Sequence, residues 1–430
     1  MKLKIISIIL IILIGVIVTI TTISNIKSKD EEFNGYIASA RINAQRQIPY
    51  TSVQKYRAAF NIKNDDESIY REYLEQSKLL GDSFYSDAIK NYPLLFPTVQ
   101  AYEDLCMYYY KSESYNSVLK IALEAKQMGM TSDKIKDLYL ECFYMYKYIK
   151  TGFEEAKTFL GNYALVKKDG LYGYITDTGS YMIMPIYKNA MDFLGNTTAV
   201  EDAQEWHMIN TSGYKIARTS IPVDSLSFVS NGKIRVSKNG KYGFTDSGLK
   251  IPDNLPYDMA SNYKNGVAAV CKNSKWALMD VNGNITTDFI FEDIKLDEYD
   301  TCINGDVIFA KYNEKYYMIN SSGQKICDTG YDDVYPFVTS EPAAICINEK
   351  WGFVDKTGKI VIEPQYTQAK SFSNGLAPVS TNGMWGYINL NNEYRIPSQF
   401  NNCLPFSSNG IAAIQENGVW NYIKLLAYYK

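Results

Sequence analysis

The sequence predicts a multidomain α plus β protein in three parts: an N-terminal transmembrane helix over residues 1–29, an α-helical domain over residues 30–159 and an all-β repeat domain over residues 160–430. Three observations support this prediction. Residues 5–23 form an uncharged apolar stretch, residues 35–160 carry apolar side chains at helical spacing, and a short phrase then recurs every 34 to 40 residues. Each part of the fold class therefore has its own periodicity.

The apolar stretch at the N-terminus is long enough to cross a membrane as a helix, because each residue adds about 1.5 Å. A cleaved signal peptide usually has a shorter apolar region and small residues at its cleavage site, and neither is seen here. Lys2 and Lys4 precede the stretch, while Lys27 and Lys29 follow it. The short basic head favours an N-terminus inside the cell and the bulk of the chain outside. We therefore expect an uncleaved signal anchor, which places a single-pass protein in the cell membrane with an extracytoplasmic bulk.

The middle of the chain predicts helical hairpins. Residues 100–130 carry bulky, aromatic and small side chains in the order that the tetratricopeptide pattern requires: Tyr102, Leu105, Tyr109, Tyr115, Val118, Ala122 and Ala125. The segment thus resembles tetratricopeptide repeats, and the resemblance implies a concave groove of the kind that binds peptides. Residues 68–97 and 132–157 are expected to form further hairpins. A generic helical bundle fits these two flanking segments equally well.

From residue 160 onwards, a repeated phrase begins with an aromatic residue that we call the anchor. The clearest copies are Trp351-Gly352-Phe353-Val354-Asp355 and Trp385-Gly386-Tyr387-Ile388-Asn389. The runs around each anchor have four to eight residues, are rich in β-branched and aromatic types, and end at Gly, Asn, Asp or Ser, which is typical of strands. Each unit therefore predicts about three short antiparallel strands. The eight anchors are Tyr172, Trp206, Tyr242, Trp276, Tyr316, Trp351, Trp385 and Trp420.

Residues 160–424 resemble the WG β-repeat family of bacterial proteins, which is named for the Trp-Gly of the anchor. The resemblance implies β-rich repeats that serve as interaction surfaces, and it brings no catalytic residues. In four of the eight copies the residue after the anchor is Gly, which permits close approach of another backbone segment. Looser or distorted packing is expected in the four copies that lack this glycine, at His207, Ala277, Tyr317 and Asn421.

Two arrangements of the eight units are compatible with the sequence. The last copy ends without a third run after Ile423, and the segment before Tyr163 is expected to be helical, so no strand is evident to complete the last unit. These observations favour an open, twisted β-array. A closed, propeller-like ring is the alternative.

Cysteine usage and charge exclude several classes of protein. The seven cysteines have neither the pairing expected of a disulfide framework nor metal-ligand spacing, so most are expected to be small core residues. The net charge is −3, and no basic patch indicates nucleic-acid binding.

No arrangement of side chains indicates catalysis. The only histidine, His207, stands in the glycine position of a repeat and is interpreted as a tolerated substitution. The acidic clusters Asp297-Glu298-Tyr299-Asp300 and Asp332-Asp333 fit solvated loops better than a pair of catalytic carboxylates. The first cluster coincides with the long 40-residue repeat, which makes it a candidate binding loop or calcium site. We therefore assign no catalytic, cofactor-binding or metal-binding residues, and we expect neither a cofactor nor an enzyme.

Two functions remain. The first is a membrane-tethered, non-enzymatic scaffold that binds protein partners at the bacterial envelope through its repeat surfaces. The alternative is a cell-surface module that binds glycan or wall polysaccharide, because rows of exposed aromatic rings could stack on sugars. The chain has 37 tyrosines, although most of them are expected to be anchors and interface residues of the repeats.

Overall fold

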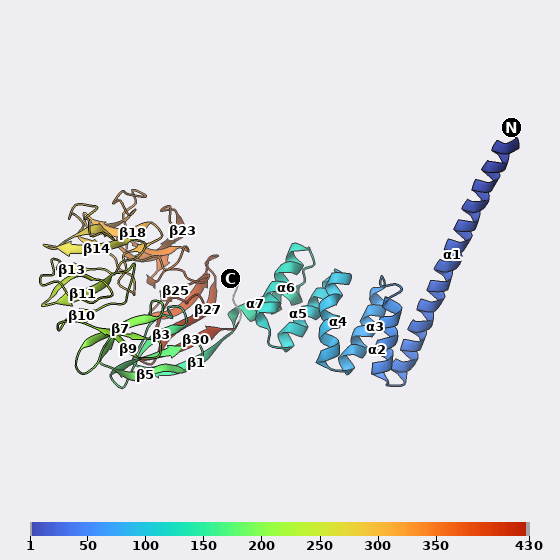
Figure 1. Cartoon of the computed structure of the whole chain (residues 1–430), viewed down its shortest axis with the longest axis horizontal. Helices are drawn as coiled ribbons and strands as arrows, with labels where there is room; N and C mark the ends of the chain where they lie inside the picture. The colour runs from blue at the N-terminus through green and yellow to red at the C-terminus, as the bar shows by residue number, and fades with distance from the viewer. Residues whose placement is uncertain (1, 427–430) are drawn as a thin grey trace. The chain divides into compact units, whose positions relative to one another are not determined.

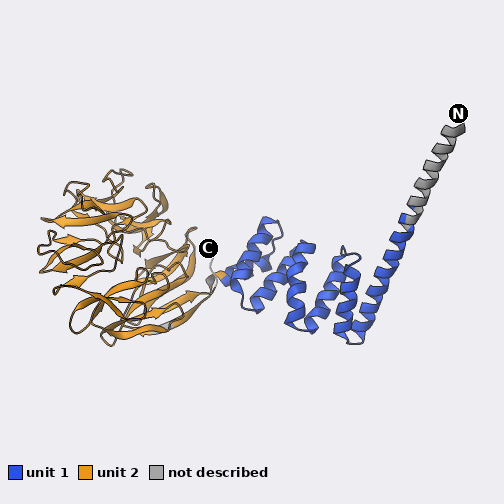
Figure 2. Cartoon of the chain, in the orientation of Figure 1, with its two compact units in different colours: residues 1–142 blue, residues 143–430 orange. Residues whose placement is uncertain are grey.

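The computed structural model describes the backbone of residues 2–426 and separates into two compact units, residues 1–142 and 143–430 (Figure 2). The apolar stretch 5–23 falls almost wholly among residues whose side chains are not described, so the predicted membrane anchor lies outside the described residues. Among the residues that are described, no helix has the length and apolar content needed to cross a membrane.

Seven helices make up the described part of the first unit. In chain order they are α1 (Lys2–Gln45), α2 (Pro49–Phe60), α3 (Glu67–Leu79), α4 (Asp82–Leu95), α5 (Val99–Lys111), α6 (Tyr115–Gln127) and α7 (Asp133–Tyr144). Successive helices from α1 to α6 pack against one another as a series of hairpins (Figure 1). The expected hairpins at residues 68–97 and 100–130 correspond to α3–α4 and α5–α6.

Local sequence explains where these helices start and which face they bury. Asp66 caps α3, because its carboxylate accepts a hydrogen bond from the backbone N–H of Ser68 at 2.9 Å, and Thr98 caps α5 in the same way. Each helix buries one stripe of side chains at helical spacing. In α6 this stripe consists of Val118, Leu119, Ala122 and Ala125.

The third expected hairpin, over residues 132–157, does not form. Helix α7 ends at Tyr144, and the chain then enters a strand, β1 (Tyr146–Phe153). The helical unit therefore ends near residue 142 and not at residue 159. The physical reason is that residues 146–153 have their backbone hydrogen-bond partners in the last strand of the chain, which lies far away in sequence.

The second unit consists of eight antiparallel sheets, the blades. Blade 1 contains β2 (Glu155–Ala156), β3 (Tyr163–Lys168), β4 (Leu171–Thr176) and β5 (Tyr181–Tyr187). Blade 2 contains β6 (Asn189–Ala190), β7 (Thr197–Glu201), β8 (Trp206–Asn210) and β9 (Lys215–Arg218). Blade 3 contains β10 (Ser225–Leu226), β11 (Ile234–Lys238) and β12 (Lys241–Thr245), and blade 4 contains β13 (Met259–Ala260), β14 (Val267–Lys272) and β15 (Lys275–Asp280). Blade 5 contains β16 (Asp293–Ile294), β17 (Ile303–Asn304), β18 (Val307–Tyr312) and β19 (Lys315–Ile319). Blade 6 contains β20 (Asp333–Tyr335), β21 (Ala343–Ile347), β22 (Lys350–Val354) and β23 (Ile360–Tyr366). Blade 7 contains β24 (Gln368–Ala369), β25 (Leu376–Thr381), β26 (Met384–Asn389) and β27 (Tyr394–Phe400). Blade 8 contains β28 (Asn402–Cys403), β29 (Ile411–Glu416), β30 (Val419–Leu425) and β1.

The complete blade has four strands, not the three that the sequence predicted. The additional strand is the two- or three-residue segment that opens each repeat, which is too short to give a periodic signal of its own. In blades 3, 4 and 5 an isolated bridge replaces the outer strand, at Tyr242–Tyr257, Trp276–Phe291 and Tyr316–Tyr331.

The eight blades form a closed propeller (Figure 1), so the expectation of an open array is wrong. Strand β1 pairs antiparallel with β30 and supplies the outer strand that the last repeat lacks. A cluster of buried side chains then joins the two ends of the ring: Phe153, Phe159 and Val166 pack with Ile411 and Tyr422. Blade 8 therefore packs against blade 1, which closes the ring.

Glycine after the anchor lets the outer strand bend against it. A Cβ atom on Gly352 would lie 2.5 Å from the carbonyl oxygen of Ile362, and one on Gly386 would lie 2.5 Å from that of Ile396. The ladder is irregular at both places, which is the signature of a β-bulge. The outer strand is reduced to a bridge in blade 3, which has this glycine, as well as in blades 4 and 5, which lack it, so the looser packing expected of the copies without glycine stays a prediction.

Candidate functional site

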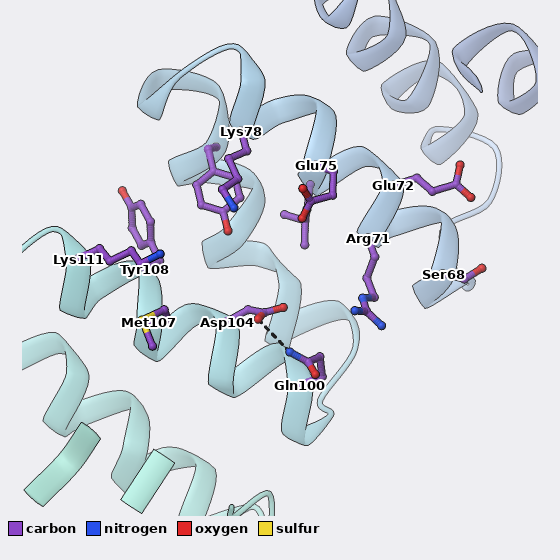
Figure 3. A pocket seen from close by; sticks show the side chains of 12 residues that line it. Ser68, Arg71, Glu72, Glu75, Lys78, Gln100, Asp104, Met107, Tyr108 and Lys111 are labelled. Carbon is purple, nitrogen blue, oxygen red and sulfur yellow. Dashed lines mark hydrogen bonds between the residues drawn. The ribbon is translucent and has the colours of Figure 1, made fainter. Parts of the chain in front are cut away.

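The helical unit contains a pocket of about 620 Å³ between α3, α4 and α5. Helix α3 contributes Arg71, Glu75 and Lys78 from successive turns, at the i, i+4, i+7 spacing of one helix face. Helix α5 contributes a second such row, Asp104, Met107 and Lys111, and Figure 3 shows the two rows facing a common space. We call this pocket the helical groove.

Three cations in the helical groove are not neutralised by a contact. Arg71, Lys78 and Lys111 form no hydrogen bond or ion pair with any described residue, and all three are exposed. Glu72 is different, because its carboxylate accepts hydrogen bonds from Arg41 at 2.7 and 2.8 Å. The Arg41 guanidinium holds the pKa of Glu72 below its usual range.

The charges of the groove are unevenly distributed. Glu75 and Asp104 lie between Arg71 on one side and the two lysines on the other (Figure 3). With Glu72 compensated, three cations face two carboxylates, so the surplus is 3 − 2 = +1. Asp104 accepts a hydrogen bond from the amide of Gln100 at 2.9 Å, and burial raises its pKa.

Two aromatic rings lie beside the lysine end. Tyr85 and Tyr108 stack edge to face with ring centroids 5.6 Å apart, and the Tyr108 hydroxyl donates to Asp82 at 3.0 Å. Both rings are half-buried, and burial raises the pKa of Tyr85 to about 12, so this ring is neutral at physiological pH. The lysine end therefore combines two amines with an apolar wall.

The sequence prediction missed this pocket. Its charged residues could have been found as two polar rows at seven-residue spacing, on helices that otherwise follow the hairpin pattern. Their proximity depends on how α3 and α5 pack, which composition does not specify.

His207 occupies a structural position in the propeller. Its side chain is 3 % exposed, its ring lies 6.4 Å from that of Tyr187, and its Nδ1 atom is 3.2 Å from the carbonyl oxygen of Glu205. No serine, threonine or cysteine side chain among the described residues forms a hydrogen bond with it. The arrangement lacks a nucleophile for the histidine to activate.

The acidic loop of blade 5 is tied to neighbouring blades and not free in solvent. Arg235 of blade 3 forms an ion pair with Asp300 at 2.6 Å, and Lys264 of blade 4 one with Asp297 at 3.2 Å. Burial raises the pKa of Glu298, whose charge also acts on Lys370 of blade 7. The long repeat thus provides a loop that contacts several blades. Within the described part of the chain, no three His, Cys, Asp or Glu residues are grouped so that they could hold a metal ion.

The remaining residue types singled out in the sequence are mostly in the core. All seven cysteines are unpaired; six are buried and Cys327 is partly exposed. The anchors Trp206, Trp276, Tyr316 and Trp385 are 5 to 6 % exposed. The most exposed tyrosines of the propeller lie on four different blades, at Tyr148, Tyr214, Tyr312 and Tyr394.

The chain is similar to several solved structures and to one family of repeats. Solved structures with a similar arrangement include a eukaryotic initiation factor (13 % identity, 66 % of this chain and 88 % of that chain, TM-score 0.44) and the Pan2 WD40 domain of Neurospora crassa (10 % identity, 65 % and 91 %, TM-score 0.36). No curated protein matches the sequence. The profile of the WG containing repeat matches residues 149–172, 223–242, 257–276, 318–351, 351–385 and 385–420. The matches cover copies from both ends of the ring, and the β-repeat part of this chain belongs to the WG-containing repeat family.

Proposed function

We propose that the chain is a non-enzymatic interaction scaffold that holds an extended, carboxylate-bearing segment of a partner protein in the helical groove. The propeller would serve as a second surface, and the apolar stretch 5–23 would tether the chain to the cell membrane. The observation that carries this proposal is the pair of unpartnered amines, Lys78 and Lys111, which face one pocket from two helices beside two half-buried aromatic rings.

The chemistry of the groove favours an acidic segment. Unpaired amines hold carboxylates by charge-assisted hydrogen bonds, which are the stronger class of hydrogen bond. Tyr85 and Tyr108 provide an apolar contact for a side chain next to that carboxylate. An extended segment suits the site because Arg71 and the two lysines lie towards opposite ends of the groove (Figure 3).

Selection from a random peptide library tests the proposal. The full chain in a membrane mimetic is the bait, and the Lys78→Glu/Lys111→Glu variant is used in parallel. We expect wild-type selections to be enriched in Asp and Glu beside an aromatic or aliphatic residue. Loss of two charge-assisted contacts, each contributing about 1.5–3 kcal/mol, should weaken the selected peptides at least tenfold on the variant.

The matched control is Lys90→Glu/Lys120→Glu, which makes the same charge change on exposed positions outside the groove. It should bind the selected peptides as the wild type does. Equal loss of binding in both variants would show only a general effect of charge. Selection of peptides without acidic residues would contradict the assignment of the groove.

A further inference from the structure

In three blades an isoleucine of the outer strand pairs with the aromatic residue that stands two positions after the anchor. The pairs are Tyr174–Ile183 in blade 1, Phe353–Ile362 in blade 6 and Tyr387–Ile396 in blade 7. All three aromatic side chains are 0 % exposed. Each isoleucine also belongs to the buried cluster that joins its blade to the next one. The isoleucine therefore helps to fill the space between neighbouring blades.

Blade 3 has the aromatic residue but not the isoleucine. Phe244 stands two positions after the anchor Tyr242, and its ring lies 4.8 Å from that of Tyr263 in blade 4. The outer strand is reduced to the bridge between Tyr242 and Tyr257, so no described residue pairs with Phe244 from outside. The described side chains in the cluster between blades 3 and 4 include no isoleucine. Phe244 accordingly stays partly exposed, unlike its three counterparts.

The loop of blade 3 does not replace the isoleucine. Leu255 is the buried residue of this loop that lies closest to Gly243, because a Cβ atom on that glycine would be 2.8 Å from the Leu255 side chain. However, Leu255 packs with Val236 and Ile251 in the cluster between blades 2 and 3. The side of the blade that faces blade 4 therefore gains no aliphatic side chain from this loop.

A pocket of about 210 Å³ lies at this position. Eight of the twelve residues that line it are apolar or aromatic, and they include Phe244 and Met279. The turn of blade 4 shows that the space is open. A Cβ atom on Gly283 would have nothing within 4 Å, whereas one on Gly213, which has the same position in blade 2, would lie 3.6 Å from Ile183. For comparison, an engineered apolar cavity of about 150 Å³ binds benzene.

The pocket also offers a backbone edge and a charge. Tyr242 and Tyr257 exchange two backbone hydrogen bonds, of 2.8 and 3.2 Å. Alternate residues of an antiparallel strand direct their backbone groups to the same side, so the N–H and C=O of Phe244 point the same way, and neither bonds to a described residue. Lys233 is the one charged residue of the lining, and its amine has no hydrogen bond or ion pair within the described part of the chain.

We propose that this pocket between blades 3 and 4 binds an isoleucine side chain from an extended, acidic segment of a partner protein. The side chain would take the place that the chain's own isoleucine has in blades 1, 6 and 7. The backbone of the segment would pair with Phe244 and so add a strand to the edge of the sheet. A carboxylate beside the isoleucine would complement the charge of Lys233. The site extends the scaffold role to the propeller and does not depend on the helical groove.

The test uses the full chain in a membrane mimetic with 13C-labelled methionine methyl groups, one for each of the 13 methionines. The signal of Met279 is identified by its loss in Met279→Leu. The probe is the peptide acetyl-Val-Ile-Glu-amide, which has the sequence of residues 361–363 in the outer strand of blade 6. We expect it to shift the Met279 signal saturably. Acetyl-Val-Ala-Glu-amide should cause no saturable shift, and acetyl-Val-Ile-Gln-amide should bind about two- to fivefold more weakly, because an exposed ion pair is lost.

Variants of the lining locate the bound peptide. Lys233→Gln should weaken the Glu peptide by the same factor and leave the Gln peptide unchanged, whereas the control Lys272→Gln, at an exposed position of blade 4 outside the pocket, should change neither. Val281→Phe fills the pocket and should abolish the response. If this variant displaces methionine signals beyond blades 3 and 4, an intermolecular NOE between the peptide isoleucine and Met279 of the wild type replaces it.

The groove variant Lys78→Glu/Lys111→Glu should respond as the wild type does, so failure at one site is distinguishable from failure at the other. The proposal is overturned if the Glu peptide gives no saturable shift, if the alanine peptide shifts the signal equally, or if Lys233→Gln leaves the difference between the Glu and Gln peptides unchanged. A response that survives Val281→Phe, or an absent NOE where that measurement replaces it, also overturns it. A Met279 signal that moves with the concentration of the chain alone would assign the pocket to a second copy and not to a partner.

Discussion

Replacing Phe153 with alanine should weaken the propeller at the point where its two ends meet. The side chain is 1 % exposed, and its ring lies 6.0 Å from Tyr422 of blade 8 and 6.4 Å from Tyr181 of blade 1. Truncation of a fully buried phenylalanine costs about 3–5 kcal/mol, because contacts are lost and a cavity is left. Since Phe153 packs against both blades, the loss should appear in blades 1 and 8 together and should fade towards blade 4.

Hydrogen exchange resolved by segment is the appropriate assay, because a chain with two units need not unfold in one step. The matched control is Tyr148→Ala on the same strand, where the side chain is 45 % exposed and donates one hydrogen bond to Glu416. That change should cost about 1 kcal/mol or less. Equal effects of the two variants, or a loss of protection in Phe153→Ala that spares blade 1, would refute the reasoning about closure.

Three further predictions concern pH, backbone packing and topology. Burial raises the pKa of Asp192 to about 7, so the folded state disfavours the ionised carboxylate and the free energy of unfolding should fall between about pH 4 and pH 7. Asp192→Asn should remove this pH dependence and raise the free energy of unfolding at pH 8 by at most about 4 kcal/mol. Denaturation measurements that give the same pH dependence for the variant and the wild type would contradict the prediction. Gly386→Ala should cost about 1–3 kcal/mol in thermal or denaturant unfolding, because its Cβ would lie 2.5 Å from the carbonyl oxygen of Ile396; Gly35→Ala, which has nothing within 4 Å in α1, should be neutral or stabilising. Protease added to intact protoplasts should digest residues 30–430, and full protection would reverse the predicted topology.

The repeat period predicted the number of blades and their β-structure, because each copy carries its own strand and turn residues. It could not predict ring closure. Residues 146–153 have no anchor phrase, and they form a strand only because β30 offers a free edge. The two-residue strands that open the blades were missed for a related reason, since hydrogen bonds to a neighbouring strand define them and their own sequence does not.

The interaction sites were harder to predict than the fold. The glycine after the anchor indicated close backbone approach, and His207 marked a departure from it, yet the sequence did not indicate that β9 ends at Arg218. The acidic loop of blade 5 was expected to be solvated, but Arg235 of blade 3 and Lys264 of blade 4 form ion pairs with it. Side chains that meet through packing of separate repeats leave no pattern in one chain.

Photocrosslinking in living cells tests the central claim most directly. A photoreactive phenylalanine analogue is placed at Met107 within the helical groove or, as the control, at Leu94 on α4, which is 73 % exposed and outside the groove. The account predicts that the Met107 probe crosslinks a partner protein through an acidic segment, and that Lys78→Glu/Lys111→Glu abolishes this crosslink while Lys90→Glu/Lys120→Glu does not. Crosslinks of equal yield from Met107 and Leu94, or a Met107 crosslink that survives reversal of the groove lysines, would contradict the account.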